Sequence, residues 1–210
     1  NELVNRGIRV PQGAELVLTG EGSMDIHTEM SNAYAIGDDK DCSYGNITID
    51  HLMNLNIDAH GENCIGIGGG KNSANSKIRI MRSGVRIECA GGNTVGIGSF
   101  DGNSNIEIRH CDLILKMACA SAVGIGSLNG KTEIILDNYR IRISESGNSL
   151  CGVGVLVHGT GSISASDGSI EFDGRGRNII CMGTDYGILD CSIQKSNTIF
   201  YCEGSSVVGI

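Results

Sequence analysis

The sequence lacks several features on which many functional classes depend. Its 210 residues include one Pro and no Trp, and aromatic residues make up 4%. No apolar run approaches the roughly 20 residues that a membrane-spanning helix needs. Lys and Arg (16) are outnumbered by Asp and Glu (24), which gives a net charge of -8, whereas nucleic-acid-binding domains are usually basic. We therefore predict no membrane insertion and no nucleic-acid partner.

Glycine and small apolar residues are abundant instead. There are 32 Gly, about twice the usual share of roughly 7%, and 40% of the residues are hydrophobic. That apolar content excludes intrinsic disorder, and the near absence of Pro excludes a collagen-like chain. A core with three Phe and no Trp must be built from aliphatic residues, which suits a repeating structure.

A short glycine-containing motif recurs along the chain. Gly-Ile-Gly or a close variant occurs at 35–37, 66–68, 96–98, 124–126, 152–154, 181–183 and 208–210. The last aligned Gly falls at positions 37, 68, 98, 126, 154, 183 and 209, so the steps are 31, 30, 28, 28, 29 and 26 residues. This nearly constant step predicts stacked structural repeats.

Each repeat contains two further stretches in which apolar and polar residues alternate, such as 47–49 and 55–57. Alternation with period two is typical of a strand with one buried face, and the Gly, Asn, Asp and Ser between the stretches favour turns. We predict an all-β, single-domain parallel β-helix over residues 1–210, wound right-handed, with three strands per coil. It would have about seven coils of 26–31 residues, the first in 1–34 and six repeats in 35–210.

The same alignment predicts outward-facing columns of side chains. Cross-strand ion pairs are expected between Arg79 and Glu107 and between Glu88 and Lys116. Three apolar side chains are also expected to face outward, namely Ile114, Ile135 and Phe200. The open ends of such a rod need cover, so we expect fused domains or end-to-end stacking, and we interpret the chain as a fragment of a longer protein.

Residues 65–70 (IGIGGG) and 46–49 (NITI) resemble the glycine-rich repeats of bacterial right-handed parallel β-helix proteins, which are surface and adhesin-like. The resemblance covers roughly 33–210. It implies a non-catalytic binding or structural module for carbohydrate or another cell-envelope component, at the bacterial surface or secreted. The same fold houses polysaccharide lyases and glycoside hydrolases, so an enzyme remains the alternative.

Cysteine usage favours a third interpretation. The nine Cys are an odd number, no CxxC spacing occurs, and most lie where an apolar residue is expected. We predict reduced thiols that act as small hydrophobic residues. Reduced thiols are typical of the cytoplasm, so a cytoplasmic sensory or assembly domain is also open.

The motifs of polysaccharide hydrolases are poorly represented. Asp38-Asp39 could supply a carboxylate pair, but His158-Gly159 and 140–142 (RIR) occur in the wrong order and Asn-Thr-Asp is absent. We assign no catalytic residues. Ligand contacts are instead expected from two aromatic rings near turns and from polar side chains on the third strand of the repeats, namely Tyr44, Tyr139, Arg86, Arg142 and Glu171.

The densest acidic turn contains Asp38, Asp39 and Asp41, whose hard oxygen ligands could hold calcium, although a solvated turn explains them as well. No other cofactor is expected. The five His lie in different coils and form neither HxH nor HExxH, so we predict no zinc site. A carbohydrate or protein ligand is the expected partner.

Overall fold

The computed structural model describes residues 4–72 and 76–210, which contain strands and turns and no helix. None of these residues therefore forms a helix that could cross a membrane. The strands are β1 (Val4–Arg9), β2 (Glu15–Thr19), β3 (Ser23–Glu29), β4 (Asn32–Ser43), β5 (Asn46–Asp50), β6 (Asn54–Asn72), β7 (Lys77–Met81), β8 (Gly84–Ser146), β9 (Ser149–Ser166), β10 (Ser169–Arg175), β11 (Asn178–Thr184), β12 (Gly187–Gln194), β13 (Asn197–Glu203) and β14 (Ser206–Val208).

The strands wind into a solenoid of about seven turns. The named strands pair in parallel, and the partners lie one repeat apart in the sequence: Ile36 pairs with Ile67, and Ile67 pairs with Ile97. Several strands continue around the corners, so β8 alone spans 63 residues. The predicted all-β parallel solenoid with three strand positions per turn is confirmed.

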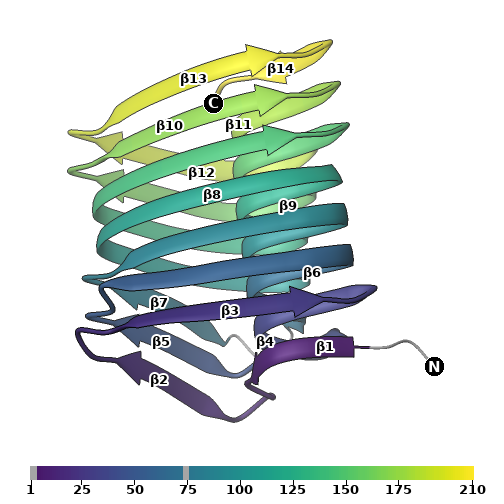
Figure 1. Ribbon diagram of the computed structural model, residues 1–210. Helices are drawn as coiled ribbons and strands as arrows, with labels where there is room; N and C mark the ends of the chain where they lie inside the picture. The colour runs from purple at the N-terminus through teal and green to yellow at the C-terminus, as the bar shows by residue number, and fades with distance from the viewer. Residues whose placement is uncertain (1–3, 73–75) are drawn as a thin grey trace.

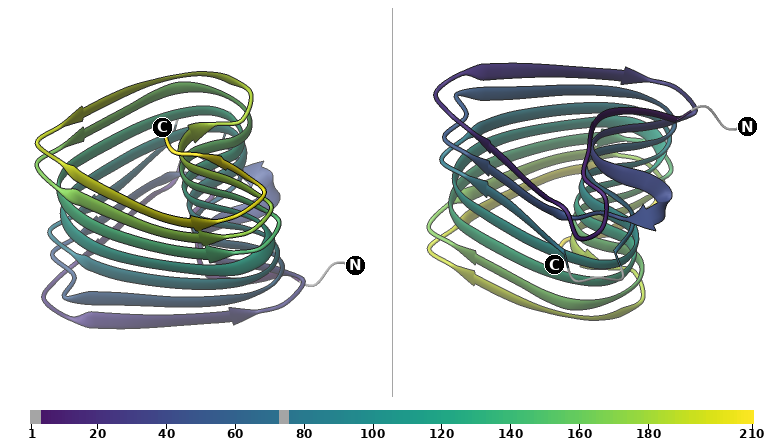
Figure 2. Two further views of the ribbon diagram at one scale, coloured as in Figure 1. Left: turned by 90° about the horizontal axis from the view of Figure 1, so that it is seen from above. Right: turned by 90° about the horizontal axis from the view of Figure 1, so that it is seen from below.

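The winding is right-handed. As the chain rises from the N-terminus to the C-terminus, β3, β10 and β13 cross the front from left to right, and β2, β5, β7 and β12 return behind them from right to left (Figure 1). The views along the axis show the turns superposed on one another (Figure 2). We call the Gly-Ile-Gly strands the first sheet, the strands aligned with β2 the second sheet, and those aligned with β3 the third sheet.

Stacked aliphatic side chains fill the interior. Fully buried columns include Ile47 and Ile78 in the second sheet and Leu55 and Val85 in the third. β-branched side chains pack well on such pleated surfaces. A second apolar cluster covers the first sheet on its other face, and it contains Tyr34, Ile65, Val95, Phe100, Val123, Cys151, Leu156 and Ile180. The first sheet is therefore buried on both faces, which the alternation alone did not predict.

The second Gly of the Gly-Ile-Gly motif is required by the backbone. Gly68 and Gly98 have φ values of 135° and 138°, which side-chain-bearing residues rarely adopt. A Cβ on Gly98 would lie 1.8 Å from the carbonyl oxygen of Gly126 in the next turn. The repeating Gly thus allows each turn to lie directly against its neighbour.

The outward columns largely follow the predicted alignment. Ion pairs join Arg79 to Glu107 (Nε–Oε2, 3.4 Å) and Lys116 to Glu88 (Nζ–Oε1, 3.3 Å), as expected. Ile135 is exposed on the second sheet, also as expected.

The outward position predicted for Phe200 is wrong. It pairs with the buried Phe172 and packs against the core, and Ile199 faces outward instead. The last repeat is shifted by one residue, and a shift of one residue exchanges the two faces of a strand.

Candidate functional site

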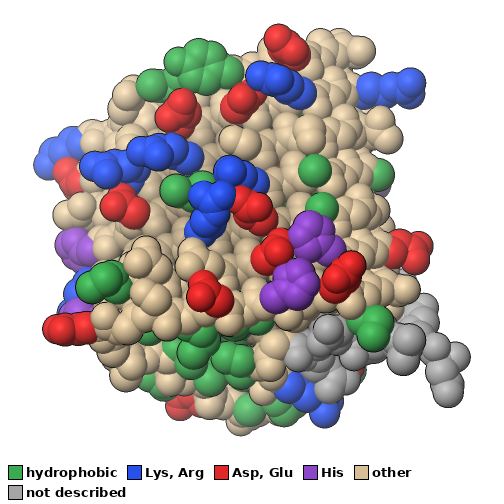
Figure 3. Space-filling model, viewed as in Figure 1, with side chains coloured by type: hydrophobic (Ala, Val, Ile, Leu, Met, Phe, Trp, Pro, Cys, Tyr) green, Lys and Arg blue, Asp and Glu red, His purple; other side chains and the backbone are tan. Residues whose placement is uncertain are grey.

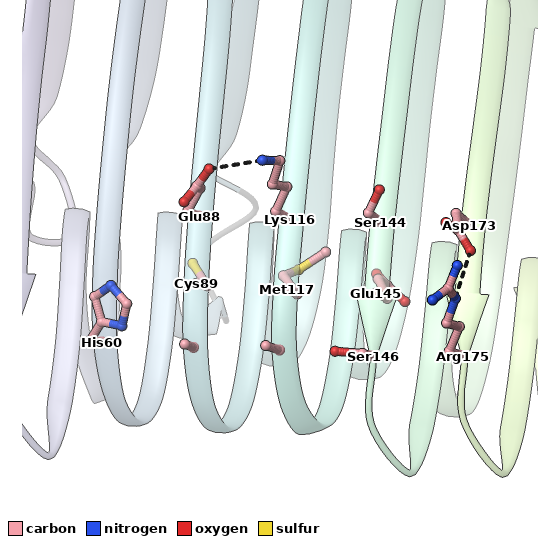
Figure 4. A pocket seen from close by; sticks show the side chains of 12 residues that line it. His60, Glu88, Cys89, Lys116, Met117, Ser144, Glu145, Ser146, Asp173 and Arg175 are labelled. Carbon is pink, nitrogen blue, oxygen red and sulfur yellow. Dashed lines mark ion pairs between the residues drawn. The ribbon is translucent and has the colours of Figure 1, made fainter.

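A trough of about 400 Å³ lies on the outer face of the third sheet. Its floor is formed by the small side chains of Ala90, Ala118 and Ser146, which follow one another at steps of 28 residues in adjacent turns. The register places His60 beside Ala90 at one end and Arg175 beside Ser146 at the other. The lining side chains form three rows across adjacent turns: the floor row, a row that begins with Cys89, and a row that begins with Glu88 (Figure 4). Small side chains between larger ones therefore create the hollow.

One wall of the trough carries charges of both signs. Glu88 accepts contacts from the Arg86 guanidinium and from Lys116, whose Nζ lies 3.3 Å from Oε1. Partial burial by itself would raise the pKa of Glu88, but hydrogen bonds from Arg86 and Lys116 outweigh it and lower that pKa below its usual value. At the other end Arg175 Nε lies 3.6 Å from Asp173 Oδ1. The positive and negative charges of this wall therefore neutralise one another.

Glu145, between Ser144 and Ser146, also lines the trough, but it alternates with these outward residues and is buried toward the interior. It is 3% exposed, and its partner in the next turn is Gly174, which has no side chain. Burial raises the pKa of the Glu145 carboxyl to about 8, and the backbone of Gly124 offsets only part of this effect. At neutral pH the group is therefore mostly protonated beneath the trough floor.

Acidic and histidine side chains gather at the His60 end of the trough. His27, Asp58 and His60 are in contact there: Nδ1 of His27 lies 3.0 Å from Asp58 Oδ2, and Nε2 of His60 lies 2.6 Å from Asp58 Oδ1. Figure 3 shows two His side chains side by side among acidic groups on this face. The sequence interpretation treated the five His as scattered, and for His27 and His60 this was wrong.

The three polar side chains that were predicted to contact a ligand, Arg86, Arg142 and Glu171, all lie on the third sheet. Arg86 contributes to the trough wall through Glu88. Arg142 and Glu171 are direct register partners on the same sheet. Their column is one further from the floor than the column that contains Glu88. Arg142 also lines a shallow hollow of about 120 Å³ with Asp112, Leu113, Ile114 and Arg140.

The two predicted aromatic contacts do not reach this surface. Tyr44 is fully buried, and Tyr139 is 4% exposed. Both rings belong to the hydrophobic core, so an exposed sugar-stacking platform formed by them is excluded.

The acidic segment, predicted as a turn, lies within β4 and is only partly assembled as a cation site. Ligand atoms of Asp38, Asp39 and Cys42 lie within 4.8 Å of one another. Asp38 is buried, however, and already accepts hydrogen bonds from Arg9 Nε (3.0 Å) and from the Asp39 amide (2.9 Å). Asp41 lies 3.5 Å from Lys71 Nζ instead. Calcium binding at this segment therefore stays a prediction.

All nine cysteines are free thiols, five of them buried. Burial raises the pKa of Cys64 to about 12 and that of Cys111 to about 11, so these thiols stay protonated. The Sγ atoms of Cys181 and Cys202 are 3.3 Å apart. The prediction that cysteines replace apolar residues is confirmed for the buried set.

No protein-family model matches the chain, and no curated protein or solved structure is significantly similar to it. The chain is a right-handed parallel β-solenoid with a trough on its third sheet that has one charged wall and a floor of small side chains.

Proposed function

We propose that this chain is a non-catalytic binding module that holds an extended, hydroxyl-rich ligand such as a carbohydrate chain in the trough. The observation that carries the proposal is the floor of Ala90, Ala118 and Ser146, which leaves an open channel along the solenoid axis. Four steps between adjacent strands, at about 4.8 Å each, separate His60 from Arg175, so the channel is about 19 Å long. That length suits a chain rather than a compact small molecule.

The chemistry of the walls favours an uncharged ligand. Glu88 is neutralised by Arg86 and Lys116, and Asp173 lies beside Arg175, so neither charge sign dominates. These groups and the hydroxyl of Ser146 offer both hydrogen-bond donors and acceptors, which a polyhydroxylated chain can satisfy together. The strands on both sides hold the groups in place, so binding would require little ordering of the protein.

The geometry gives less support to a hydrolase or lyase. Hydrolysis of a glycosidic bond needs a protonated carboxyl group and a second carboxylate on opposite sides of the bond. Glu145 has the raised pKa of a general acid, but it points into the core and is almost fully buried. The carboxylates of the wall are already paired: Glu88 contacts Arg86 and Lys116, and Asp173 lies 3.6 Å from Arg175.

A glycan-array screen tests the proposal. The purified chain should bind one or more neutral glycans, and Ala118→Trp should abolish this signal because the indole fills the channel. Ser164→Trp is the matched control, since Ser164 is an exposed small residue on the outer face of the second sheet. Circular dichroism would show that both variants fold.

Two results would contradict the proposal. One is a folded chain that binds no glycan, and the other is an Ala118→Trp variant that binds as well as the parent. The bacterial surface location and the relationship to glycine-rich repeat proteins stay predictions, as does the cytoplasmic alternative suggested by nine free thiols.

A further inference from the structure

Four metal-ligating side chains form a square on the third sheet, at the N-terminal end of the trough. In the parallel pair of β3 and β6, His27 is the register partner of Asp58 and Glu29 is the register partner of His60. Residues two apart on a strand face the same side, so all four point outward. We call this group the histidine square. Its side chains are 45–78% exposed, so they can rotate without disturbing the core.

The ring nitrogens of the square already converge on one carboxylate. Asp58 receives Nδ1 of His27 on one oxygen (3.0 Å) and Nε2 of His60 on the other (2.6 Å). The remaining ring nitrogen of His27 lies 3.7 Å from Glu29 Oε2. The two imidazoles are thus on the diagonal of the square, with carboxylates at the other corners.

We propose that the histidine square binds a divalent transition-metal ion, with Zn²⁺ as the ion tested, through His27, His60 and Asp58. Imidazole and carboxylate are ligands that Zn²⁺ accepts, and it binds nitrogen at about 2.0–2.1 Å. The ion would bind between the two rings, with the Asp58 carboxylate as the third ligand. Glu29 is close enough to orient His27 or to complete the coordination.

The two rings have to move toward each other, and turn one nitrogen each inward, before they can share an ion. The ring centroids of His27 and His60 are 6.2 Å apart. Two imidazoles bound to one tetrahedral ion at about 2.1 Å have centroids about 5 Å apart. The exposed rings can close this gap and turn toward the ion by changes in their side-chain torsions.

The surroundings also favour a cation. Asp25 lies in the neighbouring column, held at 2.7 Å by the amide of Asn56, and adds negative charge. The exposed side of the square leaves coordination positions open to water. Because the square uses only side chains of the protein, the proposal does not depend on the trough ligand.

Calorimetric titration of the full chain with ZnCl₂, in a phosphine reductant, tests the site. The parent chain should bind one equivalent of Zn²⁺. His27→Asn and His60→Asn should each lower the affinity for Zn²⁺ by at least about tenfold. His110→Asn is the matched control, because His110 is an exposed residue of β8 outside the square, and its replacement should leave the affinity unchanged.

A second measurement separates the square from the thiols. X-ray absorption at the zinc edge should show nitrogen and oxygen ligands with the scattering pattern of two imidazoles and no sulfur. Sulfur ligation would overturn the proposal, because it would place the ion at a cysteine such as Cys42 of the acidic segment. The proposal would also be overturned if the folded chain bound no zinc, or if the His27→Asn and His60→Asn variants bound zinc as tightly as the parent chain.

Discussion

Replacing the buried carboxyl of Glu145 with an amide should change how the stability of the solenoid depends on pH. The pKa of Glu145 rises from 4.5 to about 8 on folding because the side chain is buried. The folded chain therefore keeps a proton that the unfolded chain has already lost. Stability is greatest below about pH 4.5 and declines as the pH rises through 8, because charging this group in the core is unfavourable.

The size of the effect follows from the shift. A pKa raised from 4.5 to about 8 corresponds to about 5 kcal/mol of unfolding free energy lost across this interval. Few neighbours titrate in the same window: burial raises the pKa of Cys119 to about 11 and that of Cys151 well above its usual value. Because the chain also contains five His, the difference between the parent and an amide variant is what isolates Glu145.

Urea unfolding of the parent and of Glu145→Gln at pH 5, 7 and 9 measures the effect. The two proteins should be similar at pH 5, and the Gln variant should be more stable by several kcal/mol at pH 9. Glu171→Gln, an exposed carboxylate on the adjacent strand, is the control and should follow the parent. The reasoning is refuted if the parent loses no stability between pH 5 and 9, or if Glu145→Gln loses the same amount.

Three further results are expected. Gly98→Ala should cost at least about 2 kcal/mol of unfolding free energy, because its φ is 138° and the new Cβ would meet the next turn, whereas Gly22→Ala, with open space, should cost little. Phe172→Ala should cost about 3–5 kcal/mol in the same assay, since the ring is fully buried. A thiol reagent analysed by mass spectrometry should label exposed Cys191 in the native chain but label buried Cys89 only after unfolding.

The fold could be predicted because its physical requirements recur in every turn. Alternating apolar residues specify which face of a strand is buried, and the Gly that follows Ile67 or Ile97 marks the corner where backbones approach. Any single repeat would have been ambiguous. Six nearly equal steps exclude most other arrangements, since antiparallel hairpins do not require a fixed three-part unit.

The errors arose where one repeat was judged alone. Phe200 was assigned to the outer face because Ile199 was taken as the inward residue, and its pairing with Phe172 corrects this. Tyr44 and Tyr139 lie near turns, which suggested exposure, but the sequence carries no sign of the packing that covers them. Burial of this kind depends on contacts between distant segments and cannot be read from local alternation.

The histidine square escaped attention because motifs were sought along the chain. In a solenoid the neighbours of a residue are found one repeat away, so His27 lies beside Asp58 and Glu29 beside His60. The alignment of 26–29 with 57–60 already contained this information. Sites in such a fold should be sought across the columns of aligned repeats rather than in linear spacing.

The stacking of turns also determines how damage spreads through the molecule. Each strand pairs only with the turn before it and the turn after it, as β7 does with β5 and β8. Stability is then close to a sum of per-turn contributions and nearest-neighbour couplings, as in a one-dimensional lattice. A defect in the outermost turn frays only that end, whereas the same defect in the middle divides the lattice into two shorter segments, each with fewer couplings to resist unfolding.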